Sequence, residues 1–134
     1  MKILFILLAS AMQTVAWSQN WIDSYNDESV SIQYTKINYE SVSDGIHHER
    51  IIFKYVNHTD EDIQLSFDRK VSYNLAKLSD SPERTFEVLI PANTTMTYGD
   101  DKKYDKTYYI FSSDHKGTIK QKLSGFEVIN VEYE

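Results

Sequence analysis

The chain has 134 residues, of which 41% are hydrophobic and 25% are charged, a length and balance typical of one globular domain. With four glycines, two prolines and no cysteine, it is neither collagen-like, low in complexity nor stapled by disulfides, and thiolate zinc sites and cysteine nucleophiles are excluded. A formal net charge of −6 argues against a nucleic-acid partner, because binding to phosphates requires clustered Lys and Arg.

The first residues have the pattern of a secretory signal peptide. Lys2 gives a positive start, an apolar run follows, and small residues at alternate positions end the segment at Ser18. A membrane anchor is the alternative, but it needs about 20 apolar residues and this run is shorter. We expect residues 1–18 to be removed and residues 19–134 to form one exported domain without a membrane span, either secreted or periplasmic. Export without cysteines is common among bacterial proteins.

The first predicted strand changes phase along its length. Residues 30–34 alternate apolar and polar side chains, which is the pattern of a half-buried strand. Ile37 and Tyr39 continue the alternation out of step with that segment. One extra residue at positions 35–36, a β-bulge, would produce this shift.

The two strands that follow are the clearest in the chain. After a turn at residues 43–45, residues 50–57 are apolar on both faces, which predicts a central strand. Residues 57–62 form a polar loop, and residues 63–71 then alternate strictly. The side chains predicted to face inward in this segment are Ile63, Leu65, Phe67 and Val71, and those predicted to face water are Gln64, Ser66, Asp68 and Lys70.

The second half of the chain predicts shorter strands separated by turns. Residues 77–84 contain a loop around Pro82, and the strand at residues 85–90 ends at Pro91. Residues 94–98 are predicted to pair back on that strand. The remaining predicted elements are a charged loop at 100–105, a strand at 107–112, a turn at 114–117, a short return at 118–122 and a last strand at 126–133. Seven or eight short strands and no helical stripe predict a single antiparallel β-sandwich.

Three segments resemble immunoglobulin-like domains of small exported bacterial proteins. Residues 53–59 and 63–67 are similar to the central hairpin of such domains, Ile90-Pro91-Ala92-Asn93-Thr94-Thr95 to their I-P-x-N-x-T turn, and residues 126–131 to their last strand. The resemblance covers about two-thirds of the mature chain and implies an immunoglobulin-like sandwich and export. The Cys–Trp–Cys core of antibody domains is absent, and the resemblance implies no activity.

The histidines and carboxylates do not predict a metal site. His47 and His48 are adjacent and would point to opposite faces of a strand, while His58 and His115 fall in separate turns. The acidic residues at 60–62 and 100–101 do not have the spacing of a calcium loop. We therefore expect solvated loop residues and no cofactor, although histidines converging from different loops would allow a metal-dependent protein or enzyme.

Other motifs of catalysis and modification are weak or absent. The chain has no G-x-S-x-G elbow, and its isolated glycines do not form a phosphate-binding loop. Among twenty acidic residues, some carboxylate pair would always seem suited to glycoside hydrolysis, so such a pair predicts nothing. Asn57-His58-Thr59 and Asn93-Thr94-Thr95 match the glycosylation pattern, but Asn and Thr are also ordinary turn residues.

The aromatic content, at 13%, is the one positive signal for function. Tyrosine joins a flat apolar face to a polar tip, which suits binding surfaces and sugars. A candidate binding patch surrounds the charged loop and consists of Tyr98, Tyr104, Tyr108 and Tyr109. Tyrosines are also good strand formers that fill the rim of a small core, so a purely structural role remains open.

Two functions are compatible with the sequence. The first is an exported, non-catalytic module that binds a protein, glycan or other envelope component through loops or the aromatic patch. The second is a small metal-dependent protein or enzyme that uses the loop histidines and carboxylates. Exposed tyrosines in one patch would favour the first, and three or more converging His or acidic side chains would favour the second.

Overall fold

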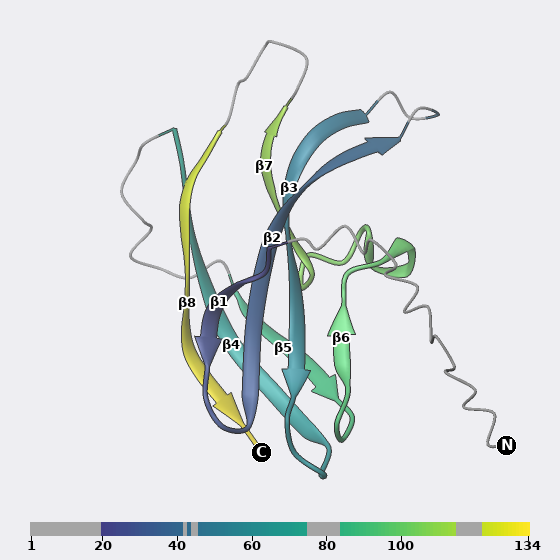
Figure 1. The fold of residues 1–134 in the computed structure, drawn as a ribbon. Helices are drawn as coiled ribbons and strands as arrows, with labels where there is room; N and C mark the ends of the chain where they lie inside the picture. Colours follow the sequence, from purple (N-terminus) through teal and green to yellow (C-terminus); the bar gives the residue numbers. More distant parts are fainter. Residues whose placement is uncertain (1–19, 42, 44–45, 75–83, 115–121) are drawn as a thin grey trace, which may run out of the picture.

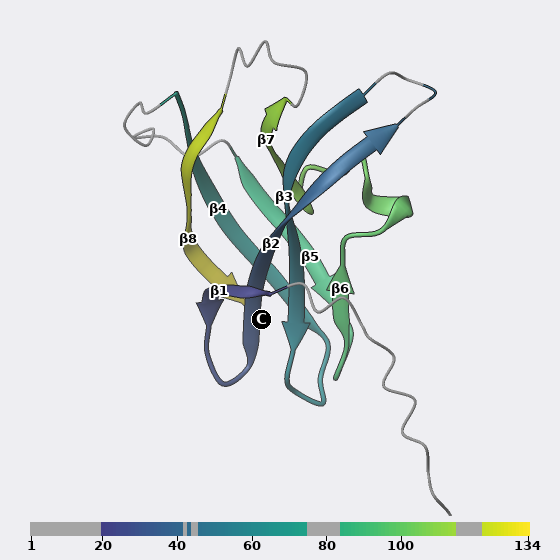
Figure 2. The ribbon, with the colours of Figure 1, turned by 45° about the horizontal axis from the view of Figure 1, so that its top comes forward.

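The computed structural model describes residues 20–41, 43, 46–74, 84–114 and 122–134. These residues form two antiparallel sheets packed face to face, so the prediction of an all-β sandwich is confirmed (Figures 1 and 2). The strands are β1 (Ile22–Asn26), β2 (Val30–Ser41), β3 (Ile46–Asn57), β4 (Ile63–Tyr73), β5 (Thr85–Ile90), β6 (Thr95–Thr97), β7 (Tyr109–Asp114) and β8 (Leu123–Tyr133). The predicted leader at residues 1–18, most of the loop at 77–84 and most of the short return at 118–122 lie outside the described residues.

The larger sheet is built around β3. Its strand order is β1-β2-β3-β6, and β7 also pairs with β3, further along the same edge. The smaller sheet has the order β5-β4-β8. Residues 50–53 of β3 are all buried, which confirms the prediction of a central strand apolar on both faces.

Side chains from both sheets form one core between them. In β4, Ile63, Leu65 and Phe67 face inward as predicted, and Phe67 packs on Phe86 with ring centroids 5.4 Å apart. Val71 is half-buried and packs against the same core. The core residues are Val30, Ile32, Ile51, Phe53, Tyr55, Ile63, Leu65, Phe67, Phe86, Val88, Ile90, Tyr108 and Ile110. Between Phe67 and Val71, the inward position of β4 is occupied by Arg69. This residue is buried, although the sequence pattern did not predict it to face inward.

The bulge predicted at positions 35–36 is wrong. β2 pairs with β3 in one unbroken register from Val30 to Ser41. The alternation shifts because a different face of β2 is buried in each half of the strand. Val30 and Ile32 face the smaller sheet, whereas Tyr39 is buried on the opposite, outer face of β2. A register shift lies instead in β1, a strand that the sequence pattern missed, between Asp23 and Tyr25.

Two predicted pairings are also wrong. β3 and β4 resemble a central hairpin in sequence but belong to different sheets, because β2 on one side of β3 and β6 and β7 on the other occupy both of its edges. β6 does not pair back on β5 but crosses to β3, with Tyr55 opposite Met96. Both connections therefore pass from one sheet to the other at the same end of the sandwich.

The buried amide of Asn57 holds these two crossings together. Its Nδ2 donates to the carbonyl oxygens of Glu61 at 2.7 Å and Ile90 at 2.9 Å, one from each crossing. Its Oδ1 accepts from the backbone N–H of Thr59 at 2.8 Å. With its amide engaged on both sides and 2% exposed, Asn57 is a structural residue of the loop.

Within the part of the chain that the structure describes, no helix combines the length and hydropathy needed to cross a membrane.

Candidate functional site

The four tyrosines of the candidate patch lie on one segment, residues 98–109, which we call the tyrosine loop. It contains a short 3₁₀-helix, η1 (Asp100–Lys102), and leads into β7. Tyr104 is 65% exposed, whereas Tyr108 is buried in the core against Tyr55, with ring centroids 5.5 Å apart. The structure therefore does not gather the four rings on one surface.

Tyr98 and Tyr109 contact a buried arginine on the outer face of the larger sheet. The guanidinium of Arg50 lies between two rings, 3.8 Å from the centroid of Tyr39 and 4.0 Å from that of Tyr109. Its Nη1 also approaches the hydroxyl of Tyr98 at 3.4 Å. Tyr108 and Tyr109 thus point to opposite faces of the sheet, as their adjacency on an extended segment requires.

Arg50 fastens the tyrosine loop to the larger sheet. Its Nη1 donates to the carbonyl oxygen of Lys103 at 2.5 Å, and its Nε donates to Nε2 of His48 at 2.7 Å. The ring of His48 stacks on Tyr39 and meets Phe111 edge to face. Charged donors make strong hydrogen bonds in such a water-poor site, so Arg50 holds the loop backbone firmly.

Side chains inside the sandwich form hydrogen bonds with the backbone near the C-terminal end of the tyrosine loop. Arg69, buried between the sheets and 4.2 Å from the centroid of Phe86, donates through Nη2 to the carbonyl oxygen of Lys106 at 3.1 Å. The hydroxyl of Tyr55 donates to the carbonyl oxygen of Thr107. Three carbonyls within five consecutive residues are thus held by side chains of β3 and β4.

Burial controls the ionisation of the inner tyrosines. Desolvation raises the pKa of Tyr55 well above its ordinary range, against the opposing field of Arg69. Desolvation also raises the pKa of Tyr108, with a further contribution from the nearby carboxylate of Asp105. Both phenols remain protonated at neutral pH; both rings pack in the core, and the hydroxyl of Tyr55 also donates a hydrogen bond.

The histidines do not converge in the described structure. His48 lies in the Arg50 cluster, and Nε2 of His58 is 2.7 Å from the hydroxyl of Ser31 at the far end of β2. His115 and the side chain of His47 lie outside what the structure describes. Among the described residues, no group of three His, Cys, Asp or Glu side chains is placed to hold a metal ion.

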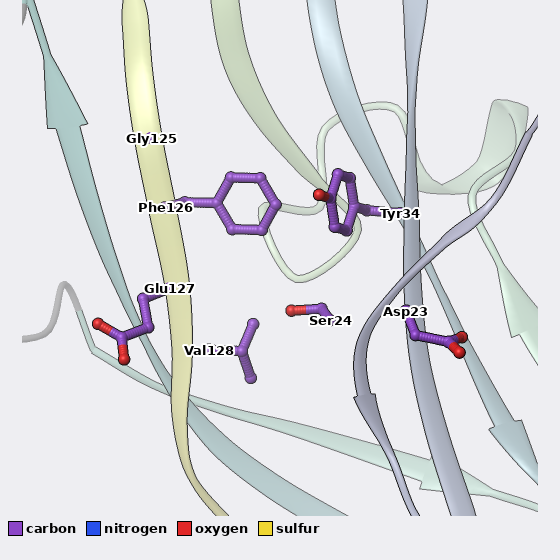
Figure 3. A pocket seen from close by; sticks show the side chains of 7 residues that line it. All are labelled: Asp23, Ser24, Tyr34, Gly125, Phe126, Glu127 and Val128. Atoms are coloured by element: carbon purple, nitrogen blue, oxygen red, sulfur yellow. The ribbon is translucent and has the colours of Figure 1, made fainter.

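A second surface feature is an open groove between β1 and β8, which we call the edge groove (Figure 3). Its volume is about 440 Å³. Tyr34 and Phe126 point toward one another across it, with ring centroids 4.8 Å apart, while Asp23 and Glu127 point outward on opposite flanks. The lining residues are Asp23, Ser24, Tyr34, Gly125, Phe126, Glu127 and Val128.

Sequence reasoning missed both arginine anchors and the edge groove. The sequence did contain a signal for the two arginines, namely a charged residue at a position where the pattern predicts burial. Arg50 is next to Ile51 in an apolar strand, and Arg69 occupies an inward position of an alternating strand. The groove left no local signal, because its two walls are about a hundred residues apart in the chain.

No protein-family model matches the chain, and no curated protein or solved structure is significantly similar to it. The geometry of the tyrosine loop and of the edge groove is therefore the basis on which a function can be proposed.

Proposed function

We propose that the protein is an exported, non-catalytic β-sandwich module that binds a protein or glycan of the cell envelope through Tyr104 and the loop around it. One observation carries this proposal: the most exposed large hydrophobic side chain described, Tyr104, lies on a loop whose backbone is held by two buried guanidinium groups. Lys103, with its Nζ 5.3 Å from the Tyr104 ring centroid, adds a cationic group beside the ring.

Preorganisation is the physical reason why such a loop suits binding. Association costs less when the contact residues are already fixed, and a tyrosine supplies a large contact area with only two rotatable side-chain bonds. Burying Arg50 and Arg69 is expensive, since each charge loses its hydration and must be compensated by hydrogen bonds and ring faces. A loop that only closed the sandwich would not require an exposed aromatic ring.

The immunoglobulin-like character and the export of the module are part of the proposal. The three changes of sheet, from β3 to β4, from β5 to β6 and from β7 to β8, resemble the connections of such sandwiches and support the first. The apolar leader before residue 19 supports export, and a cysteine-free exported chain supports a bacterial envelope.

The test compares wild type with Tyr104→Ala after a ligand has been found by glycan array or by capture from an envelope extract. We expect at least about fivefold weaker binding, since truncating a central aromatic contact removes more than about 1 kcal/mol. The urea midpoint should stay at the wild-type value, because an exposed ring contributes little to folding.

Leu89→Ala is the matched control. Leu89 is another exposed hydrophobic residue, 56% exposed on β5, and its truncation should change neither binding nor stability. Equal affinity of wild type and Tyr104→Ala would contradict the proposed site. Unfolding of Tyr104→Ala would show instead that the ring belongs to the core.

A further inference from the structure

The edge groove lies where an edge of one sheet meets an edge of the other. Among the described residues, β1 pairs only with β2 and β8 pairs only with β4. Figures 1 and 2 show β1 and β8 side by side. An edge strand presents unpaired N–H and C=O groups on its outer side. The groove therefore has hydrogen-bonding backbone on its rim as well as the apolar rings of Tyr34 and Phe126 inside.

The part of β8 that lines the groove is a regular strand. Its ladder with β4 is unbroken from Gly125, opposite Ser72, to Ile129, opposite Asp68, and register shifts lie at both ends of this stretch. The shift at one end includes Asn130, whose φ is 52° and whose Nδ2 donates to Asp68 at 2.9 Å. Bulges usually blunt an exposed edge, but here they leave the groove segment straight between them.

Gly125 opens the upper part of this rim. A Cβ added at Gly125 would meet no atom within 4 Å, so a second backbone can approach there. A stretch of five residues spans about 17 Å, which is the length of an ordinary strand.

The charge of the groove selects the kind of strand. Its lining contains two carboxylates, Asp23 and Glu127, and no Lys or Arg. Asp27 and Glu28 follow β1, and Glu132 continues β8, so most charged residues along the two walls are acidic. The nearby cations are Lys122, which precedes β8, and Lys70, which is opposite Glu127 on β4, on the side of β8 away from its free edge. A second copy of this chain, with its net charge of −6, would bring further negative charge to the groove and be repelled.

We propose that the edge groove binds an extended, basic peptide segment of a partner protein, which adds to β8 as a further strand. Alternate side chains of the added strand point to opposite faces. Apolar residues at one set of positions pack on Tyr34 and Phe126, and Lys or Arg at the other set face Glu127. This site is separate from Tyr104, and the two proposals can fail independently.

The first arm of the test measures binding of a short, labelled peptide of alternating Lys and Val by fluorescence anisotropy. Glu127→Gln should weaken binding about three- to tenfold, and Asp23→Asn should act in the same direction. Glu87→Gln is the matched control, because Glu87 is exposed on β5 at the opposite edge of the same sheet. An alternating Glu and Val peptide should not bind.

The second arm asks whether the peptide adds as a strand. N-methylation removes backbone donors but keeps the charge, and only one alternating set of peptide N–H groups faces β8 in an added strand. Methylation of that set should weaken binding by more than about tenfold, while methylation of the other set should leave it nearly unchanged. Attraction by charge alone would make the two methylated peptides equivalent.

Several outcomes would overturn the proposal. These are no binding of the Lys and Val peptide, equal effects of Glu127→Gln and Glu87→Gln, or equal affinities of the two methylated peptides. A dimer of the free protein that is lost in Glu127→Gln would assign the groove to a second copy. Tyr104→Ala should leave peptide binding unchanged, which separates this site from the tyrosine loop. The urea midpoint of each variant should match wild type, since both carboxylates are on the surface.

Discussion

Arg50 shows how a full charge is accommodated on the outer face of a small sandwich. It is 4% exposed, yet two ring faces, a histidine nitrogen and a backbone carbonyl surround its guanidinium. The planar fork of arginine can stack and donate in several directions at once, which a lysine ammonium cannot do. At the residue scale, Arg50 is therefore the main connection between the tyrosine loop and β3.

Replacing Arg50 should lower stability substantially. We expect Arg50→Ala to reduce the free energy of unfolding by about 2–4 kcal/mol, because buried acceptors lose their donor and two stacked rings lose the cation. Arg50→Lys should recover only part of this loss. Urea unfolding followed by tyrosine fluorescence measures the change.

Lys36→Ala provides the comparison for Arg50. Lys36, whose side chain is 60% exposed, forms an ion pair with the partly buried Glu49 at 3.4 Å, and a pair open to solvent on one side contributes little. Similar midpoints for Arg50→Ala and Lys36→Ala would show that the guanidinium does not hold the loop.

Asp27 makes stability depend on acid pH. Partial desolvation opposes its ionisation, but hydrogen bonds from Tyr25, the backbone N–H groups of Val30 and Ser29, and Tyr133 outweigh it and lower the pKa to about 2. The hydrogen bond between Tyr25 and Asp27 also raises the pKa of the Tyr25 hydroxyl to about 12. Through Tyr133, this carboxylate ties the end of β8 to the turn between β1 and β2.

The sign of the pH effect follows from the lowered pKa. The stabilisation by Asp27 is fully present above its ordinary pKa of 3.8 and is lost as the pH falls toward 2. Asp27→Asn should therefore be less stable than wild type at pH 7, and the difference should shrink near pH 2. Urea titrations at the two pH values test this, and a difference that does not depend on pH would contradict it.

At the scale of elements, β3 organises the molecule. Its two edges are occupied by β2 on one side and by β6 and β7 on the other, and both of its faces are covered over residues 50–53. The strand that follows β3 must then join the other sheet. The amide of Asn57 stabilises that crossing by bonding to carbonyls of both crossing loops.

The crossing of β6 to β3 can be tested by engineered disulfides, since the chain has no cysteine of its own. Lys54 and Thr97 are directly opposite one another, and the neighbouring bond from the Tyr98 N–H to the Phe53 carbonyl marks them as a non-hydrogen-bonded pair. Such pairs bring the Cβ atoms close enough for a disulfide. Lys54→Cys with Thr97→Cys should oxidise readily, as mass spectrometry would show.

A hairpin of β5 and β6 would give the opposite result. In that arrangement, with the turn at residues 91–93, Leu89 and Thr95 would face one another, so Leu89→Cys with Thr95→Cys would cross-link instead. Formation of this second bridge, and failure of the first, would return β6 to the hairpin expected from the sequence.

At the scale of the whole molecule, the prediction concerns export. The apolar leader predicts a mature protein that begins near Gln19. Mass analysis or Edman sequencing of the protein recovered outside the cytoplasm of its host should show that start. A soluble exported form that retains Met1 would contradict the signal peptide.

Local patterns could predict the strands because they depend on neighbouring residues. Period-2 alternation located β4 and β5 closely, and the two-faced apolar run located β3 in the middle of a sheet. β1 was missed because the shift between Asp23 and Tyr25 interrupts its alternation. The tyrosine patch was found as a stretch of chain, but only Tyr104 of its four rings is strongly exposed.

The sequence by itself determined an all-β chain without cysteine chemistry, the approximate position of most strands and the acidic character of the surface. Only the tertiary structure decided which sheet each strand joins, how Arg50 and Arg69 are compensated, and that β1 and β8 enclose a groove. The physical reason is that alternation reports whether a face is covered but not what covers it. The carbonyl that accepts from Arg50 is 53 residues away in the chain, and such contacts exist only after folding.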